Sequence, residues 1–97
     1  MRDELKIAVA QINPTVGDIE GNSDLVRTAH KGAAAAGADL VVFGELVLSG
    51  YPPEDLVLKG AFQDAVARAV HSLAADRVDG RPGLLVTAPW RDNGILY

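Results

Sequence analysis

Three short runs of apolar residues stand out along the chain, and each is rich in β-branched or large aliphatic side chains. They occupy residues 7–10, 40–43 and 84–88, and glycine, proline or aspartate lies close to their ends. Strands that are buried on both faces have this continuous apolar pattern, because neither face has to meet water. The sequence therefore predicts three short strands with cover on both sides.

The two segments between these runs place apolar residues three or four positions apart, which is the spacing of one helix face. We expect helices over about 23–36 and 61–75. Asn22 or Ser23 is expected to cap the first helix, and Gly37 to end it. The expected buried stripes are Leu25, Val26, Ala29, Ala33 and Ala36 in the first helix, and Phe62, Val66, Ala69, Val70 and Leu73 in the second.

Strands and helices thus alternate in the order β-α-β-α-β, with a loop over 79–83 before the third strand. This order is typical of an α/β fold in which helices cover a largely parallel sheet. After Trp90, the string at 92–94 is a strong turn signal, and a new apolar run begins at Ile95. We expect a hairpin over 90–97 with a truncated return strand, so that residues 1–97 form the N-terminal portion of one larger domain.

Composition narrows the classes of function. The 97 residues carry 13 acidic and 9 basic side chains, a net charge of −4, whereas nucleic-acid-binding domains usually present a basic stripe. The apolar runs are far shorter than the ~20 residues that cross a bilayer. We therefore expect neither a nucleic-acid partner nor a membrane span. The absence of cysteine excludes disulfides and a thiol nucleophile within these residues, and it fits a cytoplasmic protein.

Glu45 is the candidate for chemistry. It is the one charged residue in the apolar run over 41–48, and it follows the second predicted strand. Open α/β sheets place their sites at the carboxyl ends of strands, so we expect a partly desolvated carboxylate that could act as a general base. On the pattern alone, a glutamate at a loop with its carboxylate in water remains an open alternative.

The next segment, 49–56, combines a glycine with two adjacent prolines and could hold Tyr51 at a fixed place near Glu45. By spacing alone, a rigid connector is the better interpretation of this segment. His30 and His71 lie on separate predicted helices with nothing to pair them, so no metal site is expected. The sequence contains neither a dinucleotide-binding nor a P-loop glycine pattern.

Several strings resemble the nitrilase superfamily of carbon–nitrogen hydrolases. Residues 6–18 resemble the opening of such a domain, and Asn22 follows where that family often has asparagine. Residues 43–46 resemble the segment around the family's catalytic glutamate. More particularly, residues 50–56 and 87–97 resemble the glutaminase domains of the synthetases that make NAD with glutamine as nitrogen donor. The resemblance covers essentially the whole chain.

The resemblance implies a four-layer α-β-β-α sandwich, of which these residues would form a β-α-β-α-β part, and a homo-oligomer. It also implies a glutamate–lysine–cysteine triad, with Glu45 as the base that deprotonates a cysteine thiol and Tyr51 as a substrate-binding residue. The thiolate would attack the carboxamide of glutamine. The ammonia released would reach a downstream synthetase domain, which uses ATP and Mg to convert nicotinate adenine dinucleotide to NAD.

Two departures from the family pattern are visible. Gly44 stands where the family usually has proline, which changes backbone freedom more than chemistry. The lysine and the cysteine of the triad cannot be assigned, because cysteine is absent and Lys6, Lys31 and Lys59 lie in other contexts. The family places both beyond residue 97, so this segment alone should be inert. A stand-alone amidase of the same superfamily and a non-catalytic α/β binding module are the alternatives.

Overall fold

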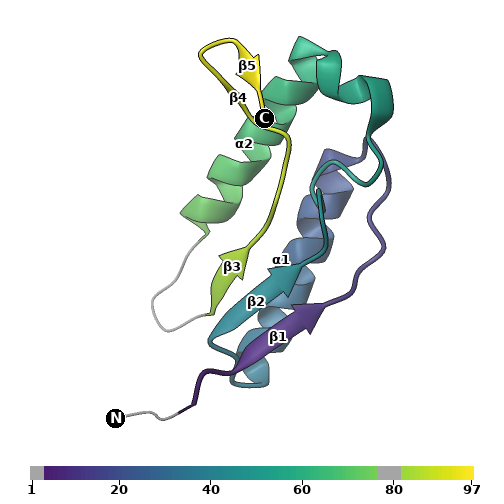
Figure 1. Ribbon diagram of the computed structural model, residues 1–97. Coiled ribbons are helices and arrows are strands. Elements are labelled where there is room, and N and C mark those ends of the chain that lie inside the picture. Colours follow the sequence, from purple (N-terminus) through teal and green to yellow (C-terminus); the bar gives the residue numbers. More distant parts are fainter. Residues whose placement is uncertain (1–3, 77–81) are drawn as a thin grey trace.

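The computed structural model describes residues 4–76 and 82–97, and it contains a parallel three-stranded sheet and two long helices (Figure 1). The predicted β-α-β-α-β order and the α/β class are confirmed. The loop predicted over 79–83 lies mostly outside the described residues. The elements in chain order are β1 (Ile7–Ala10), α1 (Ile19–Ala35), β2 (Leu40–Phe43), the 3-10 helix η1 (Glu54–Leu58), α2 (Gly60–Ala75), β3 (Gly83–Leu85), β4 (Arg91–Asp92) and β5 (Ile95–Leu96).

Helix α1 begins at Ile19, four residues before the predicted start. Its cap is Asp18, whose carboxylate accepts a hydrogen bond of 3.0 Å from the backbone N–H of Gly21. The prediction of Asn22 or Ser23 as the cap was therefore wrong, and both residues are buried inside the helix. Polar residues near a helix start resemble caps in the sequence, but here tertiary packing determines their place.

The other helix boundaries agree with the sequence pattern. Gly37 ends α1 with a φ of 82°, a conformation that glycine adopts without the steric cost of a Cβ atom. Helix α2 starts within one residue of the predicted position, and its stripe includes the buried Val66 and Leu73. In α1, Leu25 and Ala36 were wrongly placed in the buried stripe, because Leu25 is at the edge of the covered face and Ala36 is the C-cap.

Strands β1, β2 and β3 lie side by side in the order of the chain, and the two helices contact each other on the same side of the sheet. The register aligns Ala8 with Val41 and Val41 with Leu84. These three residues point toward the helices and belong to or pack against the core. The buried core cluster contains Val26, Ala33, Val41, Phe43, Val47, Leu48 and Leu73.

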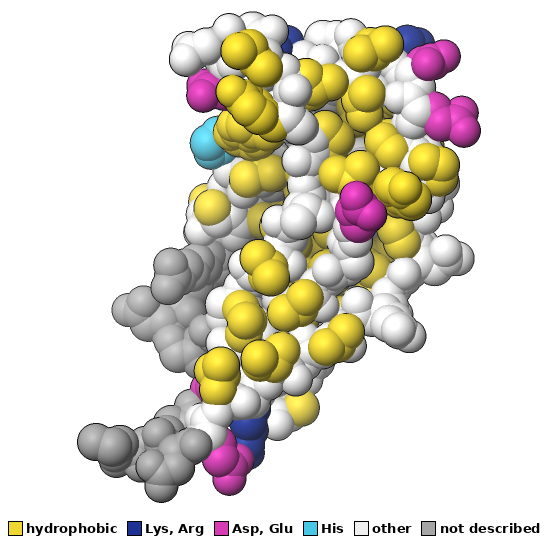
Figure 2. Space-filling view, in the orientation of Figure 1, with side chains coloured by type: hydrophobic (Ala, Val, Ile, Leu, Met, Phe, Trp, Pro, Cys, Tyr) yellow, Lys and Arg dark blue, Asp and Glu magenta, His cyan; other side chains and the backbone are white. Residues whose placement is uncertain are grey.

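The opposite face of the sheet is open in the part of the chain described. Val9 is 72% exposed and Leu85 is 52% exposed, and Figure 2 shows hydrophobic side chains gathered over the strands. The prediction of cover on both faces is thus wrong for these residues, because α1 and α2 share one face. The third strand also ends at Leu85 instead of Ala88.

The predicted hairpin over 90–97 is confirmed. Strands β4 and β5 pair antiparallel, and the two residues between them, Asn93 and Gly94, both have positive φ, as a tight hairpin turn requires. Trp90 and Tyr97 exchange both backbone hydrogen bonds beyond the strands, at 3.0 and 2.7 Å.

Two arginines connect elements that are distant in the sequence. Arg27 of α1 donates to the carboxylate of Asp76 at 2.7 Å and to the hydroxyl of Ser72 at 2.8 Å, both at the end of α2. The hydrogen bond to Asp76 raises the pKa of the Arg27 guanidinium. Arg91 of the hairpin forms an ion pair with Asp64 of α2. These contacts are partly exposed, so each adds little to stability.

Candidate functional site

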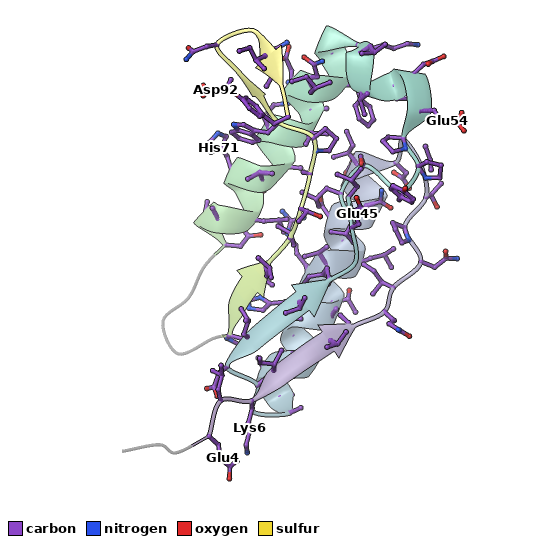
Figure 3. All side chains as sticks on the ribbon, viewed as in Figure 1. Glu4, Lys6, Glu45, Glu54, His71 and Asp92 are labelled. Atoms are coloured by element: carbon purple, nitrogen blue, oxygen red, sulfur yellow. The ribbon has the colours of Figure 1, made fainter. Side chains whose placement is uncertain are left out.

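Glu45 lies just beyond the carboxyl end of β2, at the position that the sequence predicts (Figure 3). The strands are parallel, so the carboxyl ends of β1 and β3 lie at the same edge of the sheet. The side chain of Glu45 is exposed. The expected partial desolvation is therefore wrong for the described residues, because both helices cover the other face of the sheet and leave this edge open.

The cleft beside Glu45 has a volume of about 510 Å³. This volume lies within the range of small-molecule sites. One wall is the segment that leaves β1, and the other is the segment that leaves β2. Tyr51 is 61% exposed and belongs to the second wall, so the structure brings it to the same cleft as Glu45. The lining residues are Val9, Ala10, Gln11, Ile12, Asn13, Pro14, Phe43, Gly44, Glu45, Val47 and Tyr51.

The turn after Glu45 is held by hydrogen bonds on both sides of one residue, Leu46. Its φ of 52° is uncommon for a residue with a side chain. The backbone N–H of Leu46 donates to the hydroxyl of Thr87 at 2.8 Å. Its carbonyl accepts from the backbone N–H of Gly50 at 2.9 Å and from the hydroxyl of Ser49 at 3.2 Å. These bonds hold the backbone that carries the carboxylate.

Asn22 connects the segment that leaves β1 with the segment that leaves β2. The side chain is 1% exposed, and its amide oxygen accepts from the backbone N–H of Thr15 at 2.8 Å. Its amide nitrogen donates to the carbonyls of Thr15 and Leu48, both at 2.9 Å. The sequence suggested a cap at this position and gave no signal for a link between residues so far apart.

Gly50 allows the two walls to touch. Its φ is 80°, and a Cβ atom there would lie 2.6 Å from the Cα of Val16. No side chain fits at that distance without a backbone shift. The adjacent hydrogen bond, from the N–H of Gly17 to the carbonyl of Ser49 at 2.9 Å, joins the same two segments. Gly44, by contrast, has open space where a Cβ would lie.

The remaining candidates lie away from the cleft. Lys6 precedes β1 at the opposite end of the sheet from Glu45 (Figure 3), and Lys31 and Lys59 are not among the lining residues. His30 lies 2.8 Å from the carbonyl of Pro82, and His71 of α2 contacts the ring of Trp90 edge-on.

Residues 4–76 and 82–97 contain no group of three histidine, cysteine or acidic side chains that could hold a metal ion. Neither of the long helices there has the length and apolar character needed to cross a membrane.

The α/β fold agrees with the comparison to protein families. The carbon–nitrogen hydrolase family matches residues 6–78, which is most of the chain. The chain belongs to this family.

Relatives of this chain in several bacteria carry the name glutamine-dependent NAD(+) synthetase, and two of them show the extent of the match. The protein of Rhodobacter capsulatus is 47% identical over 98 residues, covering 100% of this chain and 17% of the relative. The protein of Thermotoga maritima is 52% identical over 58 residues, covering 60% of this chain and 10% of the relative. The chain thus spans less than a fifth of the length of either relative.

Solved structures of a synthetase and of an amidase have folds similar to that of this chain. The crystal structure of a glutamine-dependent NAD(+) synthetase from Cytophaga hutchinsonii matches with a TM-score of 0.86 and 28% identity, over 96% of this chain and 16% of that one. An amidase from Nesterenkonia sp. matches with a TM-score of 0.73 and 26% identity, over 91% of this chain and 33% of that one. The predicted nitrilase-like α/β fold is confirmed.

Replacing Gly50 with alanine should destabilise the protein much more than replacing Gly37. Both glycines have a positive φ, of 80° and 82°, but only Gly50 has backbone atoms within 3 Å of the added Cβ. We expect Gly37→Ala to cost about 1 kcal/mol of unfolding free energy and Gly50→Ala at least about 3 kcal/mol. Urea unfolding measures both, and equal losses would contradict a close approach at Gly50.

Replacing Asn22 with aspartate should also destabilise the protein, although the side chain keeps its size. The carboxylate cannot donate to the carbonyls of Thr15 and Leu48, so the buried carbonyl of Leu48 loses this donor, and the part-buried carbonyl of Thr15 keeps only the N–H of Asp18. We expect a loss of about 2 kcal/mol or more in urea unfolding. Asn93→Asp is the matched control, because Asn93 is exposed in a turn that also accepts aspartate. A similar loss for both variants would disprove the role of Asn22.

Proposed function

We propose that this chain is the N-terminal part of the glutaminase domain of a glutamine-dependent NAD synthetase, and that Glu45 is its general base. The observation that carries the proposal is the place of Glu45, at the carboxyl end of β2 and in one cleft with Tyr51. The names of the relatives and their greater length support the same proposal.

In the proposed reaction, Glu45 accepts the proton of a cysteine thiol that lies outside residues 1–97. The thiolate attacks the carboxamide carbon of glutamine, and a lysine, also outside this segment, stabilises the negative oxygen that forms. Glu45 returns the proton to the leaving nitrogen, and the tetrahedral intermediate collapses to a thioester with loss of ammonia. Water then attacks the thioester, which releases glutamate and returns the thiol. Tyr51 contributes to the wall that holds glutamine.

The exposure of Glu45 is consistent with a cysteine and a lysine that come from outside residues 1–97. A cysteine and a lysine from later parts of the chain can reach the carboxylate only if the described residues leave it open, and they do. The apolar face formed in part by Val9 and Leu85 would likewise be covered by the second sheet of the α-β-β-α sandwich. A continuous apolar run in β1 has a physical reason once that sheet is present.

The proposal includes a downstream synthetase domain that receives the ammonia. That domain would bind ATP and Mg and convert nicotinate adenine dinucleotide to NAD. The protein would be a cytoplasmic homo-oligomer. The names of the relatives support the synthetase activity, and their length leaves room for a second domain.

A stand-alone amidase of the same family is the second candidate, because the Nesterenkonia amidase has a similar fold. The higher TM-score of the synthetase, 0.86 against 0.73, favours the first candidate. The downstream sequence separates the two. A synthetase requires an S-G-G-x-x-S-type ATP pyrophosphatase loop, and an amidase does not.

Replacing Glu45 with glutamine in the full-length protein should abolish glutamine-dependent NAD formation and preserve ammonia-dependent formation. The amide cannot take the thiol proton, so we expect a loss of about a hundredfold or more in the glutamine-dependent kcat. Glu54→Gln is the matched control, because Glu54 is exposed on η1 and does not line the cleft. Retained glutamine-dependent activity in Glu45→Gln would rule out this carboxylate as the base.

A further inference from the structure

We propose that Thr87 is a positioning residue for Glu45. The inference rests on the proposed role of Glu45 as general base. Thr87 lies beyond the end of β3, and its hydroxyl accepts the hydrogen bond of 2.8 Å from the backbone N–H of Leu46. The bond therefore acts on the peptide that directly follows Glu45.

The parallel sheet brings these two residues together. In the register, Val42 of β2 pairs with Leu85 of β3, so the chain two residues beyond Leu85 runs beside the chain just after β2. Thr87 and Leu46 are 41 positions apart in the sequence, and their hydrogen bond spans from one strand end to the next. A side chain that follows β3 thus holds a turn that follows β2.

The turn needs this support because of its backbone conformation. With a φ of 52°, Leu46 occupies a region in which a side chain costs free energy, and such conformations persist when surrounding contacts hold them. The bonds from Ser49 and Gly50 reach only the carbonyl side of Leu46. Thr87 holds the N–H side, which is the side next to Glu45.

The N–H side matters most for the carboxylate. Rotation of the peptide between Glu45 and Leu46 changes the ψ angle of Glu45 and hence the direction of its side chain. A base that is displaced by a fraction of an ångström loses rate without losing substrate binding, because proton transfer depends on its geometry. Thr87 is exposed, so losing its hydroxyl leaves the core unchanged.

The test compares Thr87→Val and Thr87→Ser in the full-length protein. Valine keeps the shape and removes the acceptor, whereas serine keeps the hydroxyl. We expect Thr87→Val to lower the glutamine-dependent kcat about three- to tenfold, the factor that corresponds to one hydrogen bond. KM for glutamine, ammonia-dependent NAD formation and the melting temperature should stay at wild-type values, and Thr87→Ser should restore kcat.

Thr28→Val is the control for the same chemical change, because Thr28 is exposed on α1 and outside the cleft. An unchanged kcat in Thr87→Val, an equal loss in Thr28→Val, or no rescue by serine would overturn the inference. A rise in KM at constant kcat would also overturn it, because Thr87 would then act on substrate binding. Glutamine-dependent activity in Glu45→Gln would instead overturn the proposed function itself, so the two failures are distinguishable.

Discussion

Parallel pairing of β1 with β2 and of β2 with β3 is the constraint on which the site depends. Parallel strands require long crossovers, and α1 and α2 are those crossovers. The same pairing puts all three carboxyl ends at one edge, so the segments that follow β1, β2 and β3 meet there. This meeting of strand ends explains the place of Glu45 and the cleft beside it. It also explains the hydrogen bond between Leu46 and Thr87.

Strand pairing brings the segments that follow β1 and β2 together. Polar contacts and a close backbone approach then hold these segments in one arrangement. The amide of Asn22 satisfies groups on both cleft walls, and Gly50 lets their backbones approach to a distance that any side chain would prevent. Because an unpaired buried polar group costs more than a hydrogen bond gains, these contacts favour one arrangement over its alternatives. The cleft is therefore shaped by residues that do not line it.

Much of this architecture could be predicted from the sequence, and the errors have physical causes. Strand β2 and helix α2 agree with their predictions because local periodicity determined both. The start of α1 was misplaced, since Asn22 has the chemistry of a cap but a tertiary role. Cover on both faces of β1 was expected because an apolar run does not reveal which part of a protein covers it.

The candidate site was also predictable in part, where the signal was local in the sequence. Glu45 interrupts an apolar run at a strand end, so its position could be inferred locally, and the structure places it there. Its exposure could not be inferred, because that depends on which face the helices cover. The contribution of Thr87 to the turn had no local signal either, since it joins residues 41 positions apart.

The proposed chemistry depends on Glu45 acting as the base for a cysteine thiol. The most direct measurement is the rate at which iodoacetamide alkylates the cleft cysteine of the full-length protein near neutral pH, with the modified peptide identified by mass spectrometry. This rate follows the thiolate fraction and needs no substrate turnover. We expect markedly slower alkylation when Glu45 is replaced by glutamine. An unchanged rate in that variant would contradict this role of Glu45.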